Sequence, residues 1–147
     1  MATDTPFQDR HARASGKTPG TLPVVDENPQ APSALPTPDS YTFFSDWEKK
    51  SKWKNEVTIK SIEAFREYNP SANIHRISPT PLLMTVAEND VLTPTDLAIE
   101  AYSRAREPKQ LHILPGLGHF NAYSGPAFVR NAGTQVEFLK KYLCKGE

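Results

Sequence analysis

The chain has 147 residues, 37% of them hydrophobic, which suits one modest domain or part of one and excludes a large two-domain enzyme. Its 17 basic and 17 acidic residues cancel, and no dense run of Lys or Arg could neutralise phosphates, which argues against nucleic-acid and membrane-surface partners. No stretch approaches the roughly 18 to 20 apolar residues that cross a bilayer, and the polar start lacks a signal-peptide core, so we expect a cytoplasmic protein.

Residues 1–76 are predicted to form a lid-like, largely irregular segment. Most of the fourteen prolines lie before residue 81 and interrupt every long pattern. Beyond a short helical piece near 7–14, we expect one helix, at 55–68, which Pro70 ends. An aromatic cluster precedes this helix and consists of Tyr41, Phe43, Phe44, Trp47 and Trp53. These rings either pack in a core, which is the commoner outcome, or form the wall of a binding pocket.

Residues 77–147 have a clearer pattern. The continuous apolar run at 81–87 predicts a strand buried on both faces of a parallel sheet, and a polar turn, 88–90, follows it. Thr93 is the predicted N-cap of a helix that runs from Pro94 to about Arg106. A second strand at 109–114 completes a βαβ unit with neighbouring parallel strands. A glycine-rich loop at 115–119 and a last helix at 127–143 complete this part.

Asp90 and His119 are the candidate catalytic residues. Both follow strands at the carboxyl edge of the predicted sheet, where ligands bind in open parallel sheets. Neighbouring strands are about 4.8 Å apart, so the carboxylate can reach the imidazole and orient it. Each residue has an ordinary alternative, a turn aspartate or a surface histidine. Together they favour the acid and base of a Ser-His-Asp triad, and their order in the chain is that of the α/β-hydrolases.

The same region carries a family resemblance. The segments 77–84 (ISPTPLLM) and 114–116 (LPG), with Asp90, Pro94 and His119-Phe120, resemble the C-terminal part of α/β-hydrolases related to dienelactone hydrolase. Upstream, the segments 22–25 and 39–44 and Trp53 resemble a lid-like insertion of the fungal polyketide transferases and thiohydrolases.

This resemblance implies an α/β class. Residues 77–147 would be a partial α/β-hydrolase fold, its last two parallel strands with flanking helices, after the proline-rich lid. It also implies a serine nucleophile, His119 as base and Asp90 as the residue that orients it. The reaction would be hydrolysis of, or acyl transfer from, a small-molecule ester or thioester, with no organic cofactor and no metal. Consistent with that, His11, His75 and His112 have no metal-ligand spacing.

The nucleophile is the missing part of this pattern. No serine is flanked by glycines in a G-x-S-x-G elbow. Ser78 and Ser124 are poor substitutes, because Ser78 precedes its strand and Ser124 has no elbow to aim its hydroxyl. We therefore expect the C-terminal part of a serine hydrolase, inactive until a missing N-terminal half is supplied. The alternative is a non-enzymatic remnant or interaction module, whose exposed sheet edges would bind a partner strand or a second copy.

Overall fold

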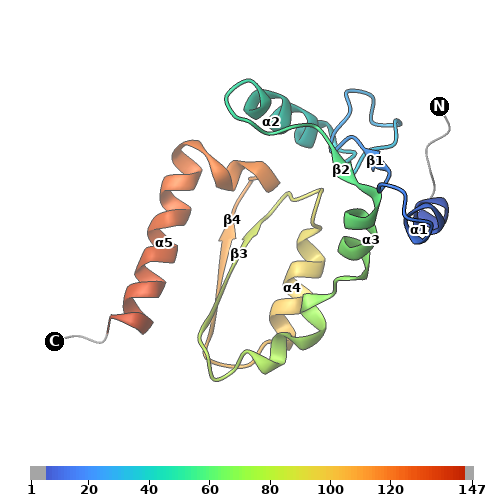
Figure 1. Cartoon of the computed structure of the whole chain (residues 1–147). Coiled ribbons are helices and arrows are strands. Elements are labelled where there is room, and N and C mark those ends of the chain that lie inside the picture. Colours follow the sequence, from blue (N-terminus) through green and yellow to red (C-terminus); the bar gives the residue numbers. More distant parts are fainter. Residues whose placement is uncertain (1–5, 145–147) are drawn as a thin grey trace. The chain divides into compact units, whose positions relative to one another are not determined.

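The computed structural model describes residues 6–144 and divides the chain into two compact units, Met1–Asn69 and Pro70–Glu147. The predicted boundary after residue 76 differs from this division, because the 3₁₀ helix η1 (Pro70–Arg76) packs on a helix of the second unit. No helix within residues 6–144 is long and apolar enough to span a membrane. Figure 1 labels the α-helices and strands described below.

The first unit contains more regular structure than the prolines suggested. Its elements are α1 (Pro6–Ala14), β1 (Thr21–Leu22), α2 (Pro38–Glu48), β2 (Val57–Thr58) and α3 (Ile59–Glu67), and β1 pairs antiparallel with β2. The helix α2 was not predicted, although Thr37 caps it by accepting the Ser40 N–H and Pro38 begins it. The predicted helix at 55–68 starts only at Ile59, because the two preceding residues pair with β1.

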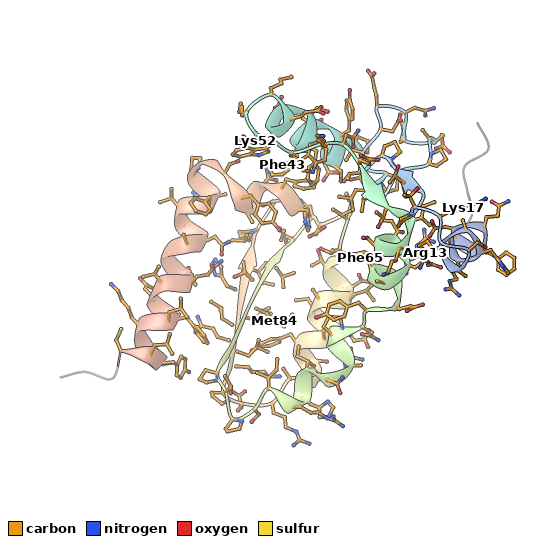
Figure 2. All side chains as sticks on the ribbon, viewed as in Figure 1. Arg13, Lys17, Phe43, Lys52, Phe65 and Met84 are labelled. Atoms are coloured by element: carbon orange, nitrogen blue, oxygen red, sulfur yellow. The ribbon has the colours of Figure 1, made fainter. Side chains whose placement is uncertain are left out.

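A network of ion pairs joins α1 to α3. The carboxylate of Asp9 on α1 is fully buried and accepts hydrogen bonds from Arg13 Nε at 2.8 Å and from the Gly20 N–H at 2.6 Å. Arg13, labelled in Figure 2, also donates to Glu63 on α3, and so does Arg10. The Arg13 guanidinium and the Gly20 N–H hold the pKa of Asp9 below its ordinary value, although desolvation opposes them.

The second unit contains the predicted βαβ arrangement. After η1 come β3 (Leu82–Ala87), α4 (Thr95–Arg104), β4 (Lys109–Leu114), the 3₁₀ helix η2 (His119–Tyr123) and α5 (Gly125–Leu143). The strands β3 and β4 are parallel neighbours, in register from Leu82 opposite Lys109 to Ala87 opposite Leu114. The expected strands and the expected last helix are therefore confirmed, and the second unit has an α/β fold.

Helices cover both faces of β3. Leu82 and Met84 pack against a buried cluster of Ile74, Ala101 and Ala105 from η1 and the α4 region. Met84 is directed toward α4 in Figure 2. The alternate residues Leu83 and Thr85 line a groove with Phe138 and Leu139 of α5. Because side chains alternate along a strand, α4 and α5 must lie on opposite faces, as Figure 1 shows. This two-sided cover explains the continuous apolar run in the sequence.

Candidate active site

The turns after the two strands bring Asp90 and His119 together. Asp90 lies three residues beyond the end of β3, and His119 begins η2 after β4. His119 Nδ1 lies 2.8 Å from Asp90 Oδ2, and the side chains are 20% and 8% exposed, respectively. The ionised carboxylate can only accept, so the ring donates through Nδ1–H and Nε2 carries no proton in the neutral tautomer. The contact that the sequence predicted is present.

Asp90 also acts as a turn residue, the ordinary role that the sequence allowed for it. Its Oδ1 accepts the backbone N–H groups of Leu92 at 3.0 Å and Thr93 at 2.8 Å, and its Oδ2 accepts the Thr93 hydroxyl at 2.8 Å. Desolvation raises the pKa of Asp90, but the hydrogen bonds from Thr93 and His119 outweigh it and hold the pKa below its ordinary value. Asp90 is therefore a carboxylate at neutral pH.

Thr93 has a different role from the predicted one. It was expected to cap α4, but α4 begins at Thr95 with Pro94 in the cap position and no side-chain cap. The Thr93 hydroxyl instead donates to Asp90 and lies 3.2 Å from His119 Nδ1. The charge-assisted bond to the Asp90 carboxylate directs the Thr93 hydroxyl toward the pair. The sequence signal for this contact was a threonine three residues after a turn aspartate.

The loop before His119 is attached to the turn before Asp90. Gly116, whose φ of +70° suits glycine, donates its N–H to Glu88 Oε2 at 2.6 Å. The carbonyl of Leu117 accepts the N–H of Asn89 at 2.9 Å. Sequence reasoning missed these contacts, because they join residues that are far apart in the chain and in irregular segments.

A cavity of about 350 Å³ opens beside the pair. Asp90, Thr93 and His119 line it together with residues of β3 and α5. The His119 ring makes edge contacts with Phe120 and Tyr123, with centroids 4.8 and 5.7 Å apart, and Tyr123 also lines the cavity. Since Asp90 occupies Nδ1, the free Nε2 is the nitrogen that can exchange a proton with a bound group.

The two candidate serines lie in other settings. Ser78 donates its hydroxyl to the Glu107 carbonyl at 2.7 Å, before the start of β4 and thus at the opposite end of the sheet from His119. Ser124 precedes α5 and makes no side-chain cap bond. Among residues 6–144, no group of three or more His, Cys, Asp or Glu side chains could hold a metal ion.

The aromatic cluster belongs to the first unit. Phe44 stacks at 5.0 Å on Trp53 and contacts Phe43 edge-on at 5.4 Å. Phe43, Phe44 and Trp53 are half-buried, while Trp47 is 45% exposed. These rings pack on one another without belonging to the buried core, and their role as a pocket wall stays a prediction.

Searches with the sequence and with the structure found relatives. The chain is 27% identical to a thiohydrolase of Eupenicillium brefeldianum over 95% of this chain and 47% of the relative. It is 31% identical to a polyketide transferase of Gibberella fujikuroi over 92% of this chain and 42% of the relative. The crystal structure of the α/β-hydrolase GrgF from Penicillium sp. sh18 superposes with a TM-score of 0.75 at 28% identity, covering 94% of this chain and 47% of that one.

No protein-family model matches the sequence. The chain spans about half the length of the curated relatives it matches, consistent with a C-terminal portion of the same fold.

Proposed function

Because the chain is homologous to fungal polyketide transferases and thiohydrolases and has part of an α/β-hydrolase fold, we propose that it supplies the base and acid of a Ser-His-Asp triad. His119 is the general base, and Asp90 orients it and stabilises the imidazolium that forms. The observation that carries the proposal is the 2.8 Å contact between His119 Nδ1 and Asp90 Oδ2 beside a cavity.

The reaction is acyl transfer from an ester or thioester of a small molecule. The serine Oγ attacks the carbonyl carbon while His119 Nε2 takes the hydroxyl proton, and His119 then gives this proton to the leaving alkoxide or thiolate. Water or a second alcohol next loses its proton to His119 and attacks the acyl-serine. The C–Oγ bond then breaks, His119 returns the proton to the serine Oγ, and the acid or the new ester is released. The lowered pKa of Asp90 supports this role, because the carboxylate stays charged while the imidazole cycles.

The nucleophile and the oxyanion donors come from polypeptide outside the 147 residues. The chain contains no G-x-S-x-G elbow, and neither Ser78 nor Ser124 hydrogen-bonds to His119 in the described part of the chain. Without serine and oxyanion donors, the 147-residue chain loses covalent chemistry and its main electrostatic stabilisation. We expect it to be inactive by itself.

The direct test compares the 147-residue chain with a chain extended by the upstream coding sequence. We expect a fluorophosphonate probe to label a serine only in the extended chain, and p-nitrophenyl esters to be hydrolysed only there. The variant H119A should abolish turnover in the extended chain. Labelling of Ser78 or Ser124 in the short chain, with turnover that H119A abolishes, would overturn the proposed inactivity. Turnover that survives H119A in the extended chain would overturn the role of His119.

The alternative function is that of a non-enzymatic interaction module. It is favoured by the sheet of β3 and β4, which has two strands and therefore leaves one edge of each without a strand partner in the described residues. Such edges pair readily with another polypeptide. An upstream reading frame without strands and without a G-x-S-x-G elbow would favour this alternative over the enzyme.

A further inference from the structure

The turn after β3 contacts the loop after β4 through three consecutive residues. The parallel ladder ends with the N–H of Glu88 donating to the Leu114 carbonyl at 3.1 Å. Beyond that point three links continue it: the Glu88 carboxylate to Gly116 N at 2.6 Å, Asn89 N to Leu117 O at 2.9 Å, and Asp90 to His119 at 2.8 Å. Only the first of these three is made by a side chain that faces solvent.

We infer that Glu88 is a positioning residue. By binding Gly116, it holds the loop after β4 in the position from which His119 contacts Asp90. This inference rests on the proposed function of that pair. The Glu88 carboxylate replaces the backbone bond that a regular strand would make at this step of the ladder. It acts on His119 through Gly116 and does not touch the imidazole.

The backbone turn of the loop gives Gly116 little support. Its own turn bond, from Leu117 N to Leu114 O, is 3.4 Å long, near the limit for a hydrogen bond. Gly116 has a left-handed backbone, and its N–H donates to the Glu88 carboxylate at 2.6 Å. This charge-assisted bond is shorter than the other hydrogen bonds given for the loop, those of Leu117 and Gly118.

Glu88 has no evident role in holding the core. Its side chain is exposed, and none of the ion pairs among residues 6–144 involves it. A second exposed glutamate, far from His119, makes the same kind of hydrogen bond to a backbone N–H. Glu107 Oε2 accepts the Lys109 N–H at 2.9 Å at the start of β4, the far end from His119. Glu107 is thus a matched control with the same chemistry and no link to the site.

The test is an NMR titration of the Asp90 carboxyl carbon in the full 147-residue chain. Loss of the bond between Glu88 and Gly116 should weaken the hydrogen bond from His119 to Asp90. The titration midpoint of Asp90 should then rise, because that hydrogen bond helps to keep the pKa of Asp90 low. Loss of a nearby negative charge alone would move the midpoint down instead. The sign of the change therefore separates positioning from simple electrostatics.

We expect E88A and the similarly sized E88M to raise the Asp90 midpoint, and to speed Gly116 amide exchange about tenfold through the lost hydrogen bond. E88Q retains an acceptor oxygen and should leave the midpoint at or below that of the wild type. E107A should change neither quantity. An unchanged or lowered midpoint in E88A and E88M, an E88Q midpoint as high as theirs, or an equal rise in E107A would overturn the inference.

These measurements need no catalytic activity, so their failure is distinct from failure of the proposed function. In an extended chain that turns over esters, E88A should lower kcat with little change in KM, because it misplaces the base without altering substrate contacts. E107A should leave both constants unchanged.

Discussion

Each of the two units contains an almost completely buried carboxylate, and the two differ in their partners. Asp9 in the first unit is held by the guanidinium of Arg13, which also donates to Glu63. Asp90 in the second unit is held by the hydroxyl of Thr93 and by the imidazole of His119, whose other ring nitrogen is not bonded to Asp90.

The surroundings of the two carboxylates differ as well. Asp9 belongs to a closed network that continues through Arg13 to Glu63 and ties α1 to α3. Asp90 lines a cavity beside the free Nε2 of His119. A buried carboxylate with a low pKa is therefore not sufficient evidence for a catalytic site. What distinguishes the candidate site is a titratable partner that faces open space.

The largest expected effect separates the two carboxylates by activity. In an extended chain that hydrolyses esters, D90N should lower kcat about ten-thousand-fold, because the wrong imidazole tautomer is then favoured. D9N should leave kcat per folded molecule unchanged. The measurement is steady-state kinetics, with the folded fraction determined by circular dichroism. Equal losses of kcat in both variants would remove the distinction drawn here.

The second effect concerns stability, for which we expect Asp9 to matter more than Asp90. D9A leaves Arg13 without its buried partner and leaves the Gly20 N–H without an acceptor, so the first unit should unfold at a clearly lower urea concentration. The second unit should keep its midpoint, since the two units are separately compact. Hydrogen exchange followed by mass spectrometry can report each unit. Loss of protection in β3 and β4 in D9A would contradict this expectation.

The third effect is acid destabilisation of both units. Both carboxylates have folded pKa values below the ordinary 3.8, so the unfolded chain binds their protons first as pH falls. The stabilisation that each carboxylate provides is fully present when the pH is above the unfolded pKa of 3.8, and it is lost as the pH falls through the lower pKa of the folded state. Urea unfolding measured from pH 6 to pH 2 should show stability declining below about pH 4. D90N should flatten this decline in the second unit, and D9N in the first.

A smaller effect on kcat is expected from Thr93, which hydrogen-bonds to Asp90 and has no counterpart beside Asp9. T93V removes the hydroxyl that donates to Asp90 Oδ2 but keeps the backbone bond to Oδ1. We expect kcat of the extended chain to fall about tenfold, as for other residues that orient a functional group. The control T134V removes a hydroxyl on α5 that donates to the Arg130 carbonyl. A tenfold loss in T134V would point to general destabilisation.

The smallest effect should come from an exposed ion pair. Glu100 and Arg104 lie one turn apart on α4, with 60% and 49% of their side chains exposed. E100A should change the stability of the second unit by no more than about 0.5 kcal/mol, because water and salt screen such pairs. If E100A lost as much stability as D9A, the exposure of an ion pair would not predict its contribution to stability in this protein.

Much of the second unit could be predicted from sequence. The apolar run that ends at Ala87, the strand at 109–114 and the last helix are present, because their patterns depend on local periodicity. The contact between Asp90 and His119 followed from topology, since neighbouring parallel strands bring their carboxyl ends to one edge. The unpredicted helix α2 shows the limit of this approach, because prolines suggested an irregular segment although one of them begins the helix.

The amino-acid sequence by itself therefore determined the order of strands and long helices in the second unit and the contact between Asp90 and His119. Only the tertiary structure decided that Thr93 binds Asp90 and does not cap α4, that Glu88 holds Gly116, and that Asp9 is buried. These roles depend on which acceptor lies nearest to a given donor after folding. Sequence patterns predict the period of a helix or strand. Which acceptor a donor binds depends on distances between residues that folding brings together.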